Sequence, residues 1–156
     1  MKIKLEYSAD VPALSNEALF LELLHLAVPE TGLQLNGGFL QLILLNVEDM
    51  AELNALHLGH TGSTDVISYD LRDAETWQAL DDEEIAAAEI YICPAVIEEN
   101  AALYGNSISA ELLLCAIHGM LHLAGEDDQT EEKRRRMQRK QEEILAKIAP
   151  PDCTFI

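Results

Sequence analysis

The sequence predicts an α+β fold, in which a small, mostly four-stranded mixed sheet is covered by about five helices. Two observations lead to this class. Apolar residues alternate with polar ones in some segments and recur every three or four residues in others, as in strands and helices respectively. These two kinds of segment do not alternate strictly along the chain, unlike in a purely parallel α/β fold. With 156 residues, 49% of them hydrophobic, the chain can fill one core, so we expect a single domain over residues 1–156.

Four segments have strand character. Residues 1–7 alternate Ile3, Leu5 and Tyr7 with charged residues, which is typical of an edge strand with one solvent-facing side. Residues 39–47 form a short, bounded apolar run, as a central strand does. Two further strands are expected, separated by an acidic loop, and they cover residues 64–71 and 89–93.

Five segments are predicted as helices, and capping residues mark several of their ends. Ser15 is a suitable N-cap for the first helix, and Pro29 is expected in the loop that follows it. Pro94 fits the first position of a helix, and Ser107 or Ser109 can cap the most apolar one. The expected ranges are 16–27, about 49–58, 94–104, about 108–124 and 130–147.

The net charge of −18 repels phosphate backbones from most of the surface. Basic residues are nevertheless concentrated in residues 130–147, so any contact with nucleic acid has to use a local patch there. This run either binds RNA phosphates or is an ordinary solvated helix face paired with neighbouring glutamates. Its members are Lys133, Arg134, Arg135, Arg136, Arg139, Lys140 and Lys147.

The N-terminal residues lack the apolar core of a signal peptide, and no segment approaches the ~20 apolar residues that cross a bilayer. A cytoplasmic protein without membrane association is therefore expected. Three cysteines, without a CxxC pair, argue against both a disulfide framework and a cysteine zinc ribbon.

The segment AIHGMLHLAGEDD, residues 116–128, carries the clearest chemical signal. His118 and His122 are four residues apart, so a helix places both on one face, where their imidazoles can converge on one cation. Gly125 can adopt a positive φ angle that ends the helix and turns the chain back. Asp128 is then placed to supply a third ligand from the loop.

Two nitrogens and one carboxylate oxygen leave a fourth position open, which is typical of a catalytic zinc. Zinc is favoured because imidazoles dominate the ligand set, while nickel, iron and manganese remain alternatives. The simpler interpretation is that the two histidines are core residues with satisfied hydrogen bonds. The glycine and the carboxylate favour the metal interpretation, since packing requires neither.

The spacing HxxxHxxGxxD also occurs in metzincin proteases, which suggests a competing function. In those enzymes the residue after the first histidine is the glutamate that acts as general base. This chain has Gly119 at that position, so the sequence disfavours a peptidase.

Three motifs, in order, resemble the YbeY family of bacterial endoribonucleases: LNALHLGHTGSTDVISYD at residues 53–70, EIYIC at 89–93 and HGMLHLAGEDD at 118–128. The resemblance implies an α+β fold and one zinc ion held by His118, His122 and Asp128. It implies a single-strand-specific endoribonuclease that acts in rRNA maturation, at the 16S 3′ end, and in ribosome quality control. The implied partners are single-stranded RNA, rRNA and the small ribosomal subunit.

The chain departs from the family pattern at two important positions. The family's third ligand is usually histidine, where this chain has Asp128, and the arginine of the family's LNxxYR segment corresponds to Leu58. An arginine near the metal would stabilise charge on a phosphate. Its loss favours an alternative function, a metal-stabilised ribosome-associated binding factor with weak or no catalysis. A hydrolase of a small phosphate or amide substrate is a third interpretation.

His60 and Glu111 are the candidate catalytic residues. His60 lies two residues after Leu58 and is either a phosphate ligand or proton donor, or an exposed loop histidine. Glu111 lies seven residues before His118, on nearly the same helix face, and is either a base or a helix-start residue stabilised by the helix dipole. Cys115 shares that face, where a buried apolar thiol is the favoured interpretation.

Overall fold

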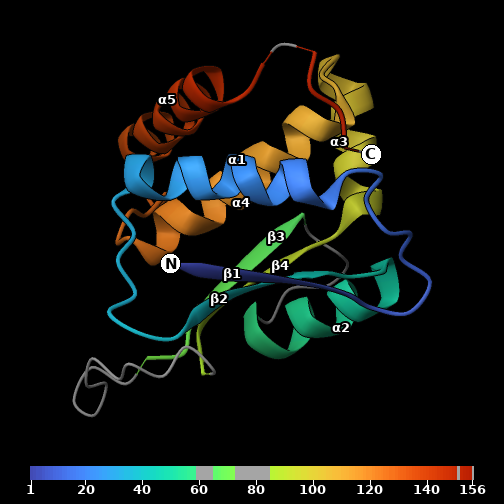
Figure 1. Cartoon of the computed structure of the whole chain (residues 1–156), viewed down its shortest axis with the longest axis horizontal. Helices are drawn as coiled ribbons and strands as arrows, with labels where there is room; N and C mark the ends of the chain where they lie inside the picture. The colour runs from blue at the N-terminus through green and yellow to red at the C-terminus, as the bar shows by residue number, and fades with distance from the viewer. Residues whose placement is uncertain (59–64, 73–84, 151, 156) are drawn as a thin grey trace.

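A four-stranded mixed sheet with helices on both faces forms the framework of the protein (Figure 1). The computed structural model describes residues 1–58, 65–72, 85–150 and 152–155. The α+β class and the mixed four-stranded sheet are as predicted. In chain order the elements are β1 (Lys2–Tyr7), α1 (Glu17–Thr31), β2 (Phe39–Leu44), α2 (Val47–Leu58), β3 (Val66–Asp70), β4 (Ala86–Ile92), α3 (Pro94–Tyr104), α4 (Ile108–Leu123) and α5 (Glu131–Ile148).

The strand order is β1-β2-β4-β3; β1, β2 and β4 run parallel to one another, and β3 runs antiparallel to β4. Strand β1 lies at one edge, as its alternating pattern predicts. Strand β2 is central, and its FLQLIL sequence is buried at nearly every position because helices cover both faces. Strand β3 forms the other edge, where Ser68 pairs with Ile90 of β4.

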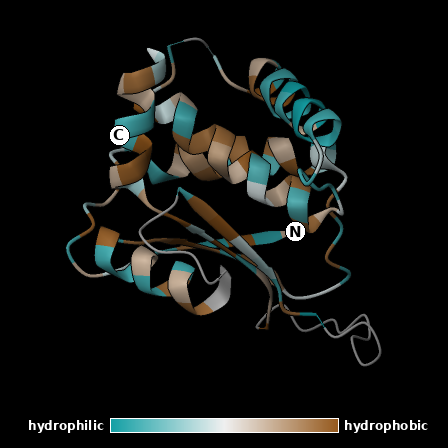
Figure 2. Cartoon of the chain, turned by 180° about the vertical axis from the view of Figure 1, so that it is seen from behind, coloured by the Kyte–Doolittle hydropathy of each residue, from teal (hydrophilic) through white to brown (hydrophobic). Residues whose placement is uncertain are grey.

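Helix α4 is the most apolar helix and packs between the sheet and α5, with α1 beside it (Figures 1 and 2). Its residues Leu112, Leu113 and Met120 join the main core over the sheet. Ile117 and Leu121 pack instead against α5 and α1. Helix α2 covers the opposite face of the sheet (Figure 1), where a smaller cluster contains Leu45, Met50, Ile67 and Cys93.

Capping side chains set several helix boundaries. Ser107 accepts a hydrogen bond from the Ala110 N–H at the start of α4, which selects it over Ser109 as the cap. Pro94 occupies the first turn of α3 as predicted. The N-cap of α1 is Asn16 rather than Ser15, because the Asn16 side chain accepts from the Leu19 N–H.

Several predicted boundaries were wrong. Strand β4 begins at Ala86 rather than at residue 89, and strand β2 ends at Leu44 rather than at residue 47. Helix α1 continues through Pro29, which was expected in a loop, and ends at Thr31 before the left-handed Gly32. The last turn is retained because Val28 and Thr31 are buried, and Thr31 also donates its hydroxyl to the Val28 carbonyl. Helix α2 begins at Val47, earlier than expected, since the Asn46 side chain accepts from the Asp49 N–H.

The three cysteines are free thiols, with Cys93 and Cys115 buried. Within the described ranges, none of the helices is both long enough and apolar enough to cross a membrane.

Gly119 lets α4 approach β4 closely. A methyl group added at Gly119 would lie 3.0 Å from Cγ2 and 3.1 Å from Cδ1 of Ile90. Ile90 is completely buried, so its side chain has little room to move away.

We expect Gly119→Val to lower the free energy of unfolding by about 2 kcal/mol, because the added branches overpack the contact with Ile90. Urea denaturation measures this change. The control is Ala102→Val, which places the same side chain on the exposed surface of α3 and should cost only a few tenths of a kcal/mol through helix propensity. Equal stability of the two variants would contradict this close packing.

Candidate metal centre

The last two turns of α4 bring the two histidines together. His118 and His122 lie on one face of the helix, with ring centroids 4.6 Å apart and ring planes nearly perpendicular. Their Nε2 atoms are 3.0 Å apart. The i, i+4 spacing therefore makes the imidazoles converge, as the sequence predicts.

A tight turn after α4 returns the chain toward these histidines. Gly125 has a φ angle of 104°, a conformation that L side chains rarely adopt. The N–H of Gly125 donates to the His122 carbonyl, and the N–H of Glu126 donates to the Leu121 carbonyl. This pairing satisfies carbonyls at the helix end while the chain reverses. Asp128 consequently lies beside the histidines.

His118, His122 and Asp128 together could hold a metal ion, because each offers one ligand atom and these atoms lie within 4.8 Å of one another. Oδ2 of Asp128 is 3.8 Å from Nε2 of His118 and 3.7 Å from Nε2 of His122. A tetrahedral cation held at about 2.0–2.2 Å by each donor separates the donors by about 3.3–3.6 Å. The observed separations between the donor atoms, 3.0, 3.7 and 3.8 Å, lie within a few tenths of an ångström of that range.

The outer ring nitrogens explain why both Nε2 atoms are suited to a cation. Nδ1 of His118 lies 2.9 Å from the side-chain oxygen of Gln141, and Nδ1 of His122 lies 3.0 Å from the Glu126 carbonyl. Each oxygen accepts a hydrogen, so in a neutral ring the proton resides on Nδ1 and the lone pair on Nε2. Two lone pairs 3.0 Å apart and beside a carboxylate repel one another unless a cation lies between them.

The neighbouring carboxylate of Asp127 has a different role from that of Asp128. It accepts from the Gln129 N–H at 3.1 Å and from the Lys133 ammonium group at 3.1 Å, at the start of α5. The backbone hydrogen bond and then Lys133 lower the pKa of Asp127. Asp127 therefore fixes the loop, which leaves Asp128 to face the histidines.

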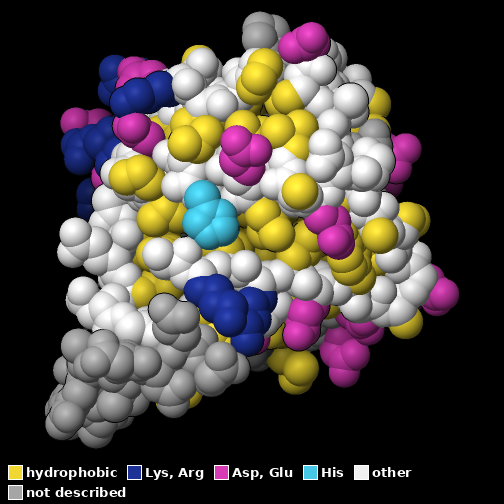
Figure 3. Space-filling view, in the orientation of Figure 1, with side chains coloured by type: hydrophobic (Ala, Val, Ile, Leu, Met, Phe, Trp, Pro, Cys, Tyr) yellow, Lys and Arg dark blue, Asp and Glu magenta, His cyan; other side chains and the backbone are white. Residues whose placement is uncertain are grey.

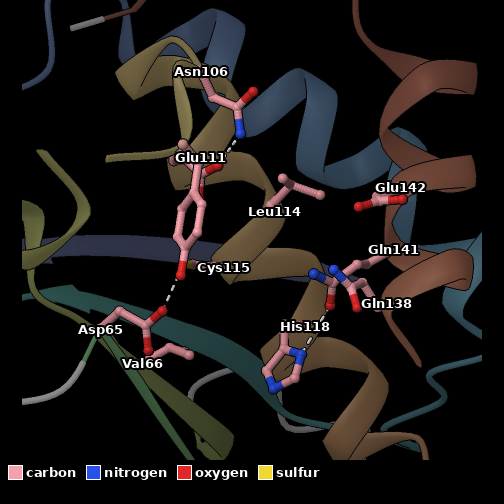
Figure 4. A pocket seen from close by; sticks show the side chains of 11 residues that line it. Asp65, Val66, Asn106, Glu111, Leu114, Cys115, His118, Gln138, Gln141 and Glu142 are labelled. Carbon is pink, nitrogen blue, oxygen red and sulfur yellow. Dashed lines mark hydrogen bonds between the residues drawn. The ribbon is translucent and has the colours of Figure 1, made fainter. Parts of the chain in front are cut away.

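Two hollows flank His118, and a substrate could approach through either. The β3 hollow, of about 590 Å³, is lined by Ser68 and Asp70 of β3 as well as by His118, His122 and Asp128. The α5 hollow, of about 420 Å³, extends from His118 toward α5 and the end of α3 (Figure 4). Asp65 and Val66 line both, so the start of β3 separates the two spaces.

The α5 hollow contains one of the two candidate catalytic residues. Glu111 lines it together with His118, and its Oε1 atom accepts from the Asn106 side-chain amide at 2.6 Å (Figure 4). Glu111 is also in the first turn of α4, where the helix dipole favours a carboxylate, so both interpretations of this residue fit its position. His60, the other candidate, lies outside the described residues.

Cys115 has the buried position expected of an apolar thiol. It lines the floor of the α5 hollow and donates its S–H to Oδ2 of Asp65 at 3.5 Å. Burial and then the nearby Asp65 carboxylate raise the pKa of the Cys115 thiol. A thiol held neutral in this way is not a metal ligand, since metals bind the thiolate.

Sequence reasoning missed Gln141, the residue that orients His118 from a distance of 23 positions along the chain. One signal was present. Gln141 lies four residues after Met137 and three before Ile144, which are the buried residues of α5. A glutamine on the apolar face of an otherwise charged helix indicates a specific hydrogen-bonding partner.

Comparison with known proteins identifies the family of this chain. The family model described as Endoribonuclease YbeY matches residues 3–149. The chain belongs to the YbeY family. The resemblance of its three motifs to that family is thereby confirmed.

Individual YbeY relatives match parts of the chain. A Thermotoga maritima protein named Endoribonuclease YbeY is 37% identical over 89 residues, which cover 57% of this chain and 53% of the relative. This chain thus aligns with about half the length of that relative. A protein of the same name from Elusimicrobium minutum is 35% identical over 111 residues, 71% of this chain and 75% of the relative. The solution structure of a Thermotoga maritima protein has a TM-score of 0.59 and 26% identity, and covers 94% of this chain and 88% of its own.

We expect Gln141→Leu to weaken Zn²⁺ binding about 10- to 100-fold, because the Nδ1–H of His118 loses the acceptor that orients the ring. Competition with a chromophoric chelator measures the affinity. Gln141→Glu keeps an acceptor oxygen and should bind at least as tightly. Gln138→Leu, one turn away on α5, is the matched control and should leave the affinity unchanged. Tight binding by Gln141→Leu would contradict the proposed orientation of His118.

Proposed function

We propose that this chain is a zinc-dependent, single-strand-specific endoribonuclease of the cytoplasm. It acts in rRNA maturation, at the 16S 3′ end, and in ribosome quality control, with the small ribosomal subunit as its partner. The observation that carries the proposal is the convergence of three donors from His118, His122 and Asp128, with both histidines oriented by acceptors on their outer nitrogens. Membership of the YbeY family supports RNA as the substrate.

We assign one zinc ion to this site because two imidazoles and one carboxylate suit zinc better than magnesium or calcium. Other divalent transition metals remain alternatives on the same ligands. Three protein ligands leave room for a substrate oxygen, as in catalytic zinc sites. When bound, zinc supplies a Lewis acid that polarises a phosphate oxygen and makes a water molecule more acidic.

The protein's own residues position the metal ligands and provide candidates for proton transfer. Gln141 and the Glu126 carbonyl hold the imidazoles, so the donors need little rearrangement. Glu111 is the candidate base in the α5 hollow, where its Oε2 atom remains available to accept a proton after Oε1 has bonded to Asn106. We retain His60 as a candidate phosphate ligand or proton donor.

Unpaired RNA suits this site better than a duplex does. All three ligands line the β3 hollow, His118 also lines the α5 hollow, and their side chains are only about a quarter to two-fifths exposed. A rigid duplex would have to bring its backbone into this recess. A single strand can bend its backbone and turn its bases outward to reach it.

The alternative is a metal-stabilised, ribosome-associated binding factor with weak or no catalysis. Leu58 at the family's arginine position and the net charge of −18 favour it. In the described part of the chain, the linings of both hollows also contain no lysine or arginine to stabilise a phosphate. The two functions are separated by expressing the His122→Ala variant in cells and measuring rRNA processing, once the variant has been shown to fold and to bind the ribosome. Loss of rRNA processing supports the nuclease, and normal processing supports the binding factor.

We expect Asp128→Ala to lose most of its bound zinc and at least about 100-fold of its RNA-cleaving activity, because a zinc ligand is removed. Asp128→His restores the usual family ligand and should retain both. Asp127→Ala, which removes the adjacent carboxylate, is the matched control and should keep its zinc. Metal analysis and cleavage of a single-stranded RNA are measured on the same preparations.

Chelation should abolish cleavage by the wild-type protein, and Zn²⁺ should restore it. Zinc-loaded wild-type protein that leaves single-stranded RNA intact would contradict the nuclease proposal. Zinc retained by Asp128→Ala would contradict the ligand set.

A further inference from the structure

The α5 hollow extends well beyond the metal ligands. Only His118 of the three ligands lines it, and its lining also includes Tyr104 at the end of α3 and Gln138 and Glu142 of α5. Its volume of about 420 Å³ is within the range of about 300–1,000 Å³ that is typical of small-ligand sites. A group bound there would lie beside any phosphate held at the metal centre.

Tyr104 is an exposed aromatic residue in a defined place. Its side chain lines the α5 hollow although the residue is 67% exposed, so packing in the core does not account for it. Gly105 follows in the left-handed conformation, and the N–H groups of Gly105 and Asn106 both donate to the Ala101 carbonyl. This cap fixes the backbone that carries Tyr104. An exposed ring held beside a hollow is a suitable platform for stacking an unpaired base.

The charge of the hollow favours a base over a phosphate. Asp65, Glu111 and Glu142 line it, and the described lining contains no lysine or arginine. Three carboxylates repel a phosphate, whereas a neutral base can present its N–H groups to them. Gln138 and Asn106 add further polar groups to the lining.

Helix α5 carries positive charge that could contact the phosphates of a bound strand. Gln138 and Glu142 also line a shallower hollow with Arg135 and Arg139. Lysine and arginine side chains gather over α5, whereas acidic side chains are spread over much of the same face (Figure 3). Arg135 already pairs with Glu131, so Arg139 is the better phosphate contact.

We propose that the α5 hollow is a nucleobase subsite, in which Tyr104 stacks on one unpaired base of the RNA while Arg139 binds a phosphate further along the strand. The RNA would thus run from the metal centre, past Tyr104 and across α5. This inference rests on the proposed function, since it names the subsite of the same RNA.

The test for stacking uses fluorescence anisotropy with a short, unstructured 2′-O-methyl oligoribonucleotide, which resists cleavage. Loss of one stacked base costs about 1–3 kcal/mol, so Tyr104→Ala should weaken binding about 5-fold or more. Tyr104→Phe keeps the ring and should bind within about twofold of the wild type, since only the hydroxyl is lost. Leu103→Ala is the matched control because Leu103 is similarly exposed on the same helix but does not line the hollow, and it should bind as the wild type does.

A series of oligonucleotides, each with one abasic position, locates the base. One position should weaken binding by the wild-type protein, and at that position Tyr104→Ala should cause no further loss. A purely structural role for Tyr104 would give the same loss at every position.

The salt dependence of binding tests the phosphate contact. Arg139→Gln should reduce the slope of log affinity against log salt concentration by about one. Arg136→Gln is the control and should not change the slope, because Arg136 lines neither hollow.

The outcomes distinguish this inference from the proposed function. RNA binding that is unaffected by Tyr104→Ala and by every abasic position would overturn the subsite and leave the nuclease proposal intact. No binding of RNA by the wild-type protein would overturn both.

Discussion

The close approach of two imidazole nitrogens at the end of α4 is the constraint on which the site depends. Nε2 of His118 and Nε2 of His122 face each other at 3.0 Å, with the Asp128 carboxylate beside them. Their outer nitrogens donate to fixed oxygens, so both lone pairs point inward. A cation makes this arrangement favourable, and the helix, the turn at Gly125 and α5 each contribute one part of it.

The core supports this geometry because α4 is held on several sides. Gly119 allows it to rest closely on Ile90 of β4, while Ile117 and Leu121 on another face pack against α5. The packing of α4 against α5 also places Gln141 within hydrogen-bonding distance of His118. The same packing that buries apolar surface therefore orients the ligand, which couples the stability of the fold to the geometry of the metal centre.

The elements that carry local signals were predictable. Pro94, Ser107 and the alternation of Ile3, Leu5 and Tyr7 marked their elements correctly, since caps and periodicity act within a few residues. Pro29 was misjudged because burial of the last turn of α1 outweighs the local cost of proline, and burial depends on residues distant in sequence. The pairing of Asp127 with Lys133 was not predicted either, although the two residues are only six positions apart.

The sequence by itself determined the class of fold, the family and the three converging side chains, because His118, His122 and Asp128 lie within eleven residues and one helix end with its turn positions them all. Only the tertiary structure decided what surrounds them. Gln141, Glu111 and Tyr104 meet around one hollow because α3, α4, α5 and the start of β3 pack together there. Such contacts follow from packing between distant segments, which local periodicity and spacing do not encode.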